Sequence, residues 1–212
     1  MVVKAAIAGS KVFDVDQPLS GAQASEFVLA GYVGCIRYFP LNSSNVPGCL
    51  TALELQVLLT AGLAVAAVQH VDSPPWYPTA ALGTSHGQYM AAYGKAIGYP
   101  TGSPMYCDIE SVATGTAAKD VIDYFTNWAS EVTAAGYVAG LYVGWEPGMS
   151  PQQIYDLPTK SYWRAYNYDD GVPVRGFQIV QHTEKTLGGV TFDPNTVQVD
   201  ELGDLPIFVF GS

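Results

Sequence analysis

Two acidic side chains stand one residue apart near the middle of the chain, in the stretch PMYCDIES at 104–111. Asp108 and Glu110 end an apolar run that is typical of a β-strand, where residues i and i+2 project to the same face. Carboxyl groups held together raise the pKa of at least one of them, because ionising both in a partly dry cleft is costly. A raised carboxyl group suits the general acid of glycosidic-bond cleavage, and an ionised partner supplies the base, nucleophile or electrostatic stabiliser.

Further acids lie near the predicted ends of other strands. Asp14 stands near the end of the first predicted strand, and Asp200 near the end of the eighth. In a closed eight-stranded barrel the first and eighth strands are neighbours, and the fourth faces them across the mouth. We therefore predict that Asp14, Asp108, Glu110 and Asp200 converge there as catalytic residues.

Two other interpretations of these acids exist. They cap helices or pair with Arg37 and lysines at the barrel rim, or they bind a hard cation such as Ca²⁺ or Mg²⁺. No loop rich in Asp and Asn supports the cation, so we expect no metal. Four converging acids in a chain with only 13% charged residues favour a functional site.

Aromatic and polar side chains near predicted strand ends are candidates for binding a sugar chain. Rings stack on sugar faces, although most such rings fill a core. Trp145 follows a strand and precedes a loop, which makes it the best platform, and Trp163 and Tyr166 come next. Gln181 offers hydrogen bonds to hydroxyl or acetamido groups. The predicted substrate-binding set is Arg37, Tyr38, His70, Trp145, Trp163, Tyr166 and Gln181.

The elements that must position these residues repeat a helix–glycine–strand pattern. The pattern reads LAGYVGCIRYF at 29–39, TAGLAVAAVQH at 60–70, AIGYPTGSPMYCDIE at 96–110 and AAGYVAGLYVG at 134–144. Glycine just past a helix end adopts the left-handed conformation at little cost and ends the helix. Capping-box patterns at Ser20–Gln23 and Thr51–Glu54 predict two helix starts. Hydrophobic strands that alternate with helices indicate βαβ units around a parallel sheet.

Eight strands are predicted, at 11–16, 33–39, 63–70, 104–110, 138–144, 160–166, 177–183 and 196–202. Helices fit after the first four strands and less well at 150–156. Only 10 to 12 residues separate the last three strands, too few for a helical crossover. We therefore predict one α/β domain over 1–212, a TIM-like barrel of about five βα units and three further strands. A doubly wound open sheet is the alternative, disfavoured because no glycine-rich phosphate loop follows the first strand.

The composition excludes several classes of partner. The chain has 9 Lys and Arg against 19 Asp and Glu, a net charge of −10, so binding to nucleic acid or an anionic membrane is disfavoured. Three cysteines without C-x-x-C spacing argue against a zinc site or a disulfide framework. No apolar run is long enough for a membrane span, and the amino-terminal stretch is too broken for a signal peptide. We expect a soluble protein, cytoplasmic until it is released or exported to act at the cell wall. The apolar tail at 205–210 is predicted to cover the barrel floor or to pack on a protein partner.

The ordered motifs resemble those of a known family. They are VFDVD at 12–16, YCDIE at 106–110, YWRAY at 162–166, FQIVQHT at 177–183 and VQVDEL at 197–202. This layout resembles glycoside hydrolase family 25 lysozymes, and still more the related glycoside-hydrolase-like family known as domain of unknown function 1906. IRYF at 36–39 and the stretch at 50–65 strengthen the second resemblance. One departure is Asp16, which stands where the lysozymes usually carry serine.

The resemblance implies a flattened barrel that cleaves the β-1,4 bond after N-acetylmuramic acid in peptidoglycan, without a cofactor. Glu110 would be the general acid, and Asp108 would stay ionised to orient or stabilise the substrate. One form of this mechanism has Asp108 act through the acetamido group of the substrate. Asp14 and Asp200 would line the floor. An endolysin or tail-associated lysin of a bacteriophage is the expected context. The competing hypothesis is a non-catalytic glycan-binding or assembly module, such as a phage-tail component, that retains the barrel.

Overall fold

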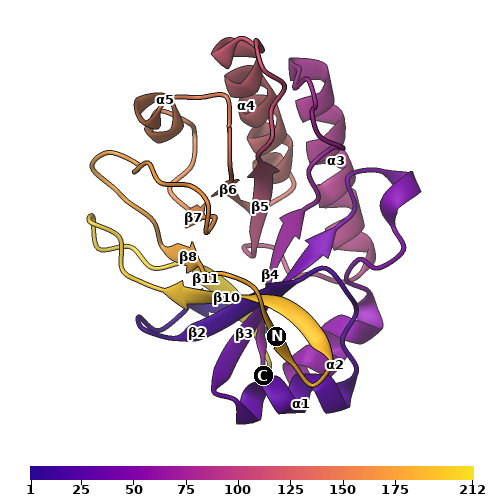
Figure 1. The fold of residues 1–212 in the computed structure, drawn as a ribbon. Helices are drawn as coiled ribbons and strands as arrows, with labels where there is room; N and C mark the ends of the chain where they lie inside the picture. The colour runs from indigo at the N-terminus through magenta and orange to yellow at the C-terminus, as the bar shows by residue number, and fades with distance from the viewer.

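Eight strands close into a barrel in the computed structural model, which describes residues 1–212 (Figure 1). In order around the ring they are β4 (Ala64–Gln69), β3 (Tyr32–Phe39), β2 (Lys11–Val15), β10 (Val190–Val197), β8 (Ile179–Gln181), β7 (Tyr162–Arg164), β6 (Val138–Val143) and β5 (Pro104–Ile109). β5 pairs with β4 and so closes the ring, and only β10 runs antiparallel to its neighbours. The predicted barrel is confirmed, and the open doubly wound sheet is excluded.

Five helices follow the first five strands of the barrel. They are α1 (Gly21–Leu29), α2 (Ala52–Ala61), α3 (Ala80–Ala96), α4 (Ala118–Ala134) and α5 (Pro151–Tyr155), and a short 3₁₀ turn, η1 (Ser43–Asn45), precedes α2. No helix follows β7 or β8, as the short connections predicted. Figure 1 shows α3 and α4 side by side on one flank and α1 and α2 on another.

The helix ends show how the sequence sets these boundaries. Ser20 accepts a hydrogen bond from the backbone N–H of Gln23, whose side chain accepts one from Ser20 in return, so the predicted capping box is complete. Thr51 caps α2 in the same way, but the Glu54 side chain turns away to Arg37. Gly62 ends α2 in the left-handed conformation, with φ of 98°, where a side chain would be strained.

The predicted eighth strand at 196–202 is wrong. The strand is β10, six residues earlier, and it runs antiparallel between β2 and β8. Pro194 lies within β10, and the strand was missed in the sequence because proline usually argues against a central strand. The alternation of apolar and polar residues in TVQVDEL is typical of a strand, but β10 ends at Val197 and the chain turns after it. β7 and β8 are also shorter than predicted.

Three further strands were not predicted: β1 (Val2–Ala5), β9 (Lys185–Leu187) and β11 (Ile207–Phe210). β9 forms a hairpin with β10. β1 and β11 form an antiparallel ribbon that joins the barrel at the pairing of Val209 with Val65 near the start of β4, and the two chain ends lie close together (Figure 1). Phe208 and Val209 are fully buried, so the apolar tail packs within its own chain at the amino-terminal end of the barrel.

The three cysteines, Cys35, Cys49 and Cys107, are free and buried. No helix is long and apolar enough to cross a membrane.

Candidate active site

Asp108 and Glu110 lie at the carboxyl end of β5, in the mouth of the barrel, the end formed by the carboxyl ends of its parallel strands. The Asp108 side chain points inward and exposes 6% of its surface, and its Oδ1 atom is buried without a hydrogen-bond partner. Glu110 stands just past the strand and stays partly exposed. It packs against Gly144, where an added Cβ atom would lie 2.3 Å from the Glu110 Cβ. The charge of Glu110 acts on Asp108, so the two carboxyl groups lie near each other at the end of β5.

Two strained residues hold the loops beside this pair. Ser111 and Glu146, which follow β5 and β6, adopt the left-handed backbone region with φ of 52° and 50°. The Ser111 N–H donates to the carbonyl of Trp145 at 2.7 Å, and the Trp76 indole donates to the carbonyl of Glu110 at 2.8 Å. These bonds fix Glu110 and Trp145 on adjacent strand ends.

The electrostatics of the pair favour a retained proton. Burial raises the pKa of Asp108 well above its ordinary value, and the charges of Glu110 and Asp14 raise it further. Burial also raises the pKa of Glu110. Since an ionised oxygen without a hydrogen bond is costly in a buried position, the proton that the two groups share favours Asp108 in the unliganded protein. This opposes the expectation that Asp108 stays ionised.

Asp14 joins the same mouth from β2, as predicted. Its carboxylate accepts hydrogen bonds from Asn195 Nδ2 at 2.6 Å and from Gln181 Nε2 at 3.1 and 3.2 Å. Burial, followed by the charge of Asp193, raises its pKa to about 7, although both hydrogen bonds act in the opposite direction. Asp14 therefore changes its protonation near neutral pH.

Asp193 and Asn195 on β10 complete the site and were missed in the sequence. Asp193 pairs with Asp14 across the two strands, and its own pKa is raised by burial and by Glu184. Asn195 bridges Asp14 to the indole of Trp163. The D-x-N spacing in FDPNT was the available signal, because it repeats the i, i+2 pattern of Asp108 and Glu110.

The prediction that Asp200 joins the mouth is wrong. Asp200 lies beyond the opposite end of β10 and forms an ion pair with Arg175 at 2.6 Å. Burial raises its pKa, but hydrogen bonds from the backbone of Asp204 and from Arg175 and Gln178 outweigh burial and lower it. Asp200 therefore closes a turn at the barrel floor, where it has a structural role.

Arg37 is also wrongly predicted as a substrate-binding residue. It is fully buried between the barrel and α2, where it forms an ion pair with Glu54 at 2.8 Å. Its remaining donors bind the carbonyls of Val15 and Gly48. A side chain that is fully buried among these partners cannot reach a ligand in the mouth.

Tyr38, His70 and Gln181 do lie at the mouth. Tyr38 stacks on His70 with 4.5 Å between ring centroids, and His70 contacts Asp16 at 3.2 Å on the rim. Gln181 is buried and saturated, because its amide donates to Asp14 and Asp193 while its carbonyl oxygen accepts from the Tyr142 hydroxyl. It positions the acids and has no free group for a substrate.

The predicted aromatic residues divide into two groups. Trp145 and Tyr166 are about half exposed beside the mouth, as a stacking platform requires. Trp163 is fully buried and packs edge-on against Tyr142 at 4.4 Å, so the prediction that it contacts substrate is wrong. Its indole instead donates to Asn195 and supports the acids from below.

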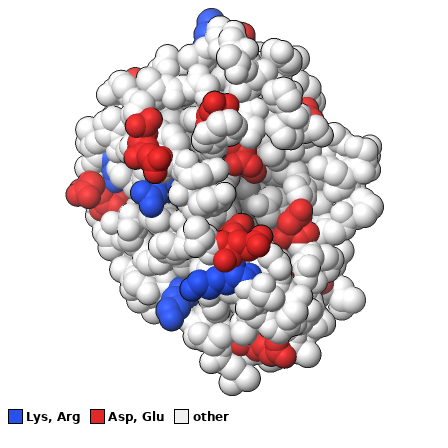
Figure 2. All heavy atoms as spheres, in the orientation of Figure 1, with Lys and Arg blue, Asp and Glu red and all other residues white.

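Figure 2 shows a hollow near the centre of one face with acidic side chains on its rim. A hollow of about 420 Å³ adjoins Asp14 through Asp193 and is lined by Tyr166, Thr183, Glu184 and Asp193. No group of three or more His, Cys, Asp or Glu side chains has the arrangement of a metal site.

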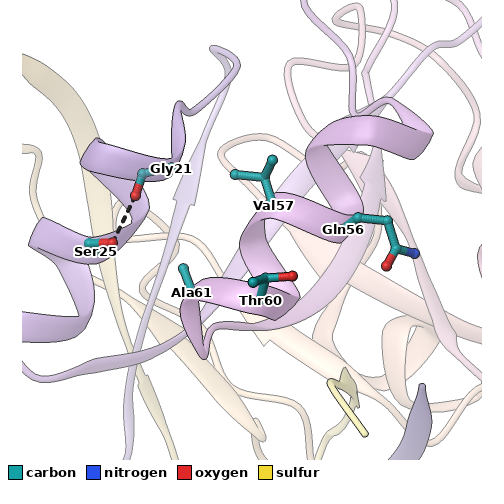
Figure 3. A pocket seen from close by; sticks show the side chains of 6 residues that line it. All are labelled: Gly21, Ser25, Gln56, Val57, Thr60 and Ala61. Carbon is teal, nitrogen blue, oxygen red and sulfur yellow. Dashed lines mark hydrogen bonds between the residues drawn. The ribbon is translucent and has the colours of Figure 1, made fainter.

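Another hollow, of about 410 Å³, lies on the outer surface between α1 and α2 (Figure 3). Its lining is Gly21, Ser25, Gln56, Val57, Thr60 and Ala61. Because none of these side chains is ionisable, this hollow offers no group for acid–base chemistry.

Comparison with known proteins gives one family match. The profile described as Rv2525c-like, glycoside hydrolase-like domain matches residues 25–204. No curated protein matches the sequence.

Several solved structures share the fold. The Tat-secreted protein Rv2525c of Mycobacterium tuberculosis superposes with a TM-score of 0.69 at 20% identity over 90% of this chain and 96% of that one. The catalytic domain of endolysin ply40 from bacteriophage P40 of Listeria monocytogenes gives 0.66 at 14% identity, over 91% and 95%. A family 25 glycosyl hydrolase from Bacillus anthracis gives 0.58 at 14% identity, over 90% and 89%. At these identities the likeness establishes the fold.

Proposed function

Since the chain belongs to the Rv2525c-like, glycoside hydrolase-like domain family, we propose that it hydrolyses bacterial cell-wall glycan. The family match confirms the resemblance to glycoside-hydrolase-like proteins that the sequence motifs indicated. The neighbouring structures include a Tat-secreted protein and an endolysin catalytic domain, and these descriptions support an action at the cell wall. A phage origin stays a prediction.

The observation that carries this proposal is the pair of carboxyl groups at the end of β5. Asp108 is buried and Glu110 is partly exposed, and the pKa of each is raised. A carboxyl group that keeps its proton near neutral pH beside a second carboxyl group is the arrangement that glycosidic-bond cleavage uses. Trp145 on the adjacent strand end supplies an exposed ring for a sugar face.

We infer a role for each group from its position. Glu110 reaches solvent and protonates the glycosidic oxygen as the bond to the anomeric carbon breaks, so that the leaving sugar departs as an alcohol. When the substrate binds, the proton that the pair shares passes from Asp108 to Glu110, so that ionised Asp108 orients the substrate and stabilises the positive charge that develops on the ring. Water then adds to the anomeric carbon and returns a proton to Glu110. Asp14 is held in place by hydrogen bonds from Gln181 and Asn195, and its charge helps to keep the pKa of Asp108 raised.

The test is the activity of Glu110→Gln on suspensions of bacterial cell wall, followed by loss of turbidity and release of reducing ends. We expect a loss of about 10² to 10⁴-fold, the usual contribution of a general acid, with unchanged far-UV circular dichroism and melting temperature. Glu201→Gln is the matched control, because Glu201 is exposed at the opposite end of the barrel and should keep full activity. Full activity in Glu110→Gln would rule out this role for Glu110.

A second candidate is a glycan-binding or assembly module without turnover. Two observations favour it: Asp108 is almost fully buried, and the Asp14 carboxylate accepts hydrogen bonds from two amides. A module of this kind binds cell-wall glycan, and the glycan has the same length after long incubation. Sizing the glycan by chromatography before and after incubation separates the two candidates.

A further inference from the structure

Five carboxyl groups form a continuous row along the mouth. We call Glu184, Asp193, Asp14, Asp108 and Glu110 the acidic row. The pairing of β2 with β10 sets Asp193 opposite Asp14. Neighbouring members lie close enough for the charge of one to raise the pKa of the next. Glu184 raises that of Asp193, Asp193 raises that of Asp14, and Asp14 and Glu110 raise that of Asp108.

No Lys or Arg of the chain forms an ion pair with a member of this row. The ion pairs of the chain engage Arg37, His70, Lys119 and Arg175, and none of them includes a member of the acidic row. His70 reaches only Asp16 at the rim. The carboxylates of the acidic row repel one another when they are ionised, and a positively charged ligand among them would relieve that repulsion.

One hydrogen-bond acceptor at the mouth has no donor within the protein. The amide groups of Gln181 and Asn195 already donate to Asp14. Asp108 Oδ1, in contrast, is a buried acceptor with no partner. An amino group that is protonated carries three N–H donors and no acceptor, so it matches what the mouth leaves unsatisfied.

The outer end of the row has room for a sugar ring. The hollow of about 420 Å³ places the carboxylates of Asp193 and Glu184 beside the half-exposed ring of Tyr166 and the hydroxyl of Thr183. An aromatic face beside acids suits a cationic sugar, by stacking and by cation–π attraction. The acids are not arranged to hold a metal ion, so the cation is an organic one.

We propose that the acidic row selects glycans whose hexosamine units carry free amino groups in place of acetamido groups. The amino groups bind as ammonium ions between Asp193 and Glu184 and at Asp108 Oδ1. This inference rests on the proposed function, because it concerns the same mouth and the same class of glycan, and it accounts for an excess of acid in a protein directed at the cell wall.

The test compares two short oligosaccharides of equal length, one of glucosamine and one of N-acetylglucosamine. Binding is measured by isothermal titration calorimetry at about pH 6, where an amine of ordinary pKa is charged. We expect the glucosamine oligomer to bind about tenfold or more tightly, and about 0.5 M salt to reduce the difference. The oligomers recovered after titration are sized by mass spectrometry, so that hydrolysis is scored separately from binding.

Matched variants locate the selectivity. Asp193→Asn and Glu184→Gln should each reduce the preference for the glucosamine oligomer several-fold. Asp156→Asn removes the same unit of charge from an exposed position just after α5, outside the mouth, and should change nothing. Equal binding of the two oligomers would overturn the proposal, even if Glu110→Gln still abolishes hydrolysis. A preference that survives both mouth variants would overturn it too, since it would then arise from the net charge alone.

Discussion

Replacing Asp14 by asparagine is expected to flatten the dependence of stability on pH. The Asp14 carboxyl group is buried, and burial together with the charge of Asp193 raises its pKa to about 7, from 3.8 in an exposed aspartate. The folded protein therefore holds this proton more tightly than the unfolded chain does. Between these two pKa values the folded state binds more protons, so its stability falls as pH rises.

The magnitude follows from the size of this shift. A shift of about three pKa units corresponds to about 4 kcal/mol, because each unit contributes about 1.4 kcal/mol. This stabilisation is fully present below about pH 4 and is lost once the pH passes about 7. The amide that replaces the carboxyl group in Asp14→Asn does not ionise, so the stability of the variant has no such loss, although the amide forms poorer hydrogen bonds with Gln181 and Asn195.

The assay is urea unfolding of both proteins at a series of pH values from about 4 to about 8. The difference in unfolding free energy, variant minus wild type, should rise by up to about 4 kcal/mol across this range. Asp156→Asn removes an exposed acid just after α5 and should give a curve parallel to that of the wild type. Parallel curves for Asp14→Asn, within about 0.5 kcal/mol, would refute the reasoning that Asp14 is held protonated by its surroundings.

Two further predictions concern the scaffold. Gly83→Ala on α3 should destabilise the protein by about 1 to 3 kcal/mol in urea, because the new Cβ atom would lie 2.1 Å from the carbonyl oxygen of Tyr124 on α4. Gly21→Ala is its control and should stay within about 0.5 kcal/mol, since the nearest atom there, on Val57, is 3.8 Å away; equal losses in both would contradict the close helix contact. Arg37→Met should cost about 3 to 5 kcal/mol in urea by leaving Glu54 buried and unpaired, yet should leave glycan hydrolysis per folded molecule unchanged. Lost hydrolysis in a folded Arg37→Met protein would return Arg37 to the list of substrate-binding residues.

The barrel was predictable because local signals agreed with the global fold. Glycines with positive φ at Gly31, Gly62, Gly98 and Gly136 follow the first four helices, and the strands that come after them are continuous apolar runs. The same agreement placed the two acids at the end of β5, since strand parity alone puts them on one face. What sequence could not supply was the antiparallel direction of β10, which no local pattern encodes.

The mistaken assignment of Asp200 followed from that single error. The expectation of an acid on the eighth strand was sound, but the mouth end of an antiparallel strand is its amino-terminal end. The acid there is Asp193, and Asp200 lies at the floor. Placing the strand six residues late thus exchanged an acid at the mouth for an acid at the floor.

The errors on Arg37 and Trp163 differ in kind. Arg37 and Tyr38 are consecutive on β3, so parity forbids both from facing the mouth, and the sequence contained this information. Trp163 does face inward, level with Tyr142 and Asp108 across the paired strands. Its burial depends on how deeply the neighbouring loops cover it, and depth is a property of the assembled barrel.

The mouth is a place where the fold is less stable than it could be. Asp14, Asp108, Glu110 and Asp193 all have a raised pKa, and each therefore destabilises the folded state once it ionises. An apolar or amide side chain at any of these positions would remove that cost. The same chain pairs its other buried acids, Glu54 and Asp200, with arginine. The protein neutralises its buried acids elsewhere but leaves those at the mouth unpaired, and this contrast supports the proposal that the mouth is a binding site.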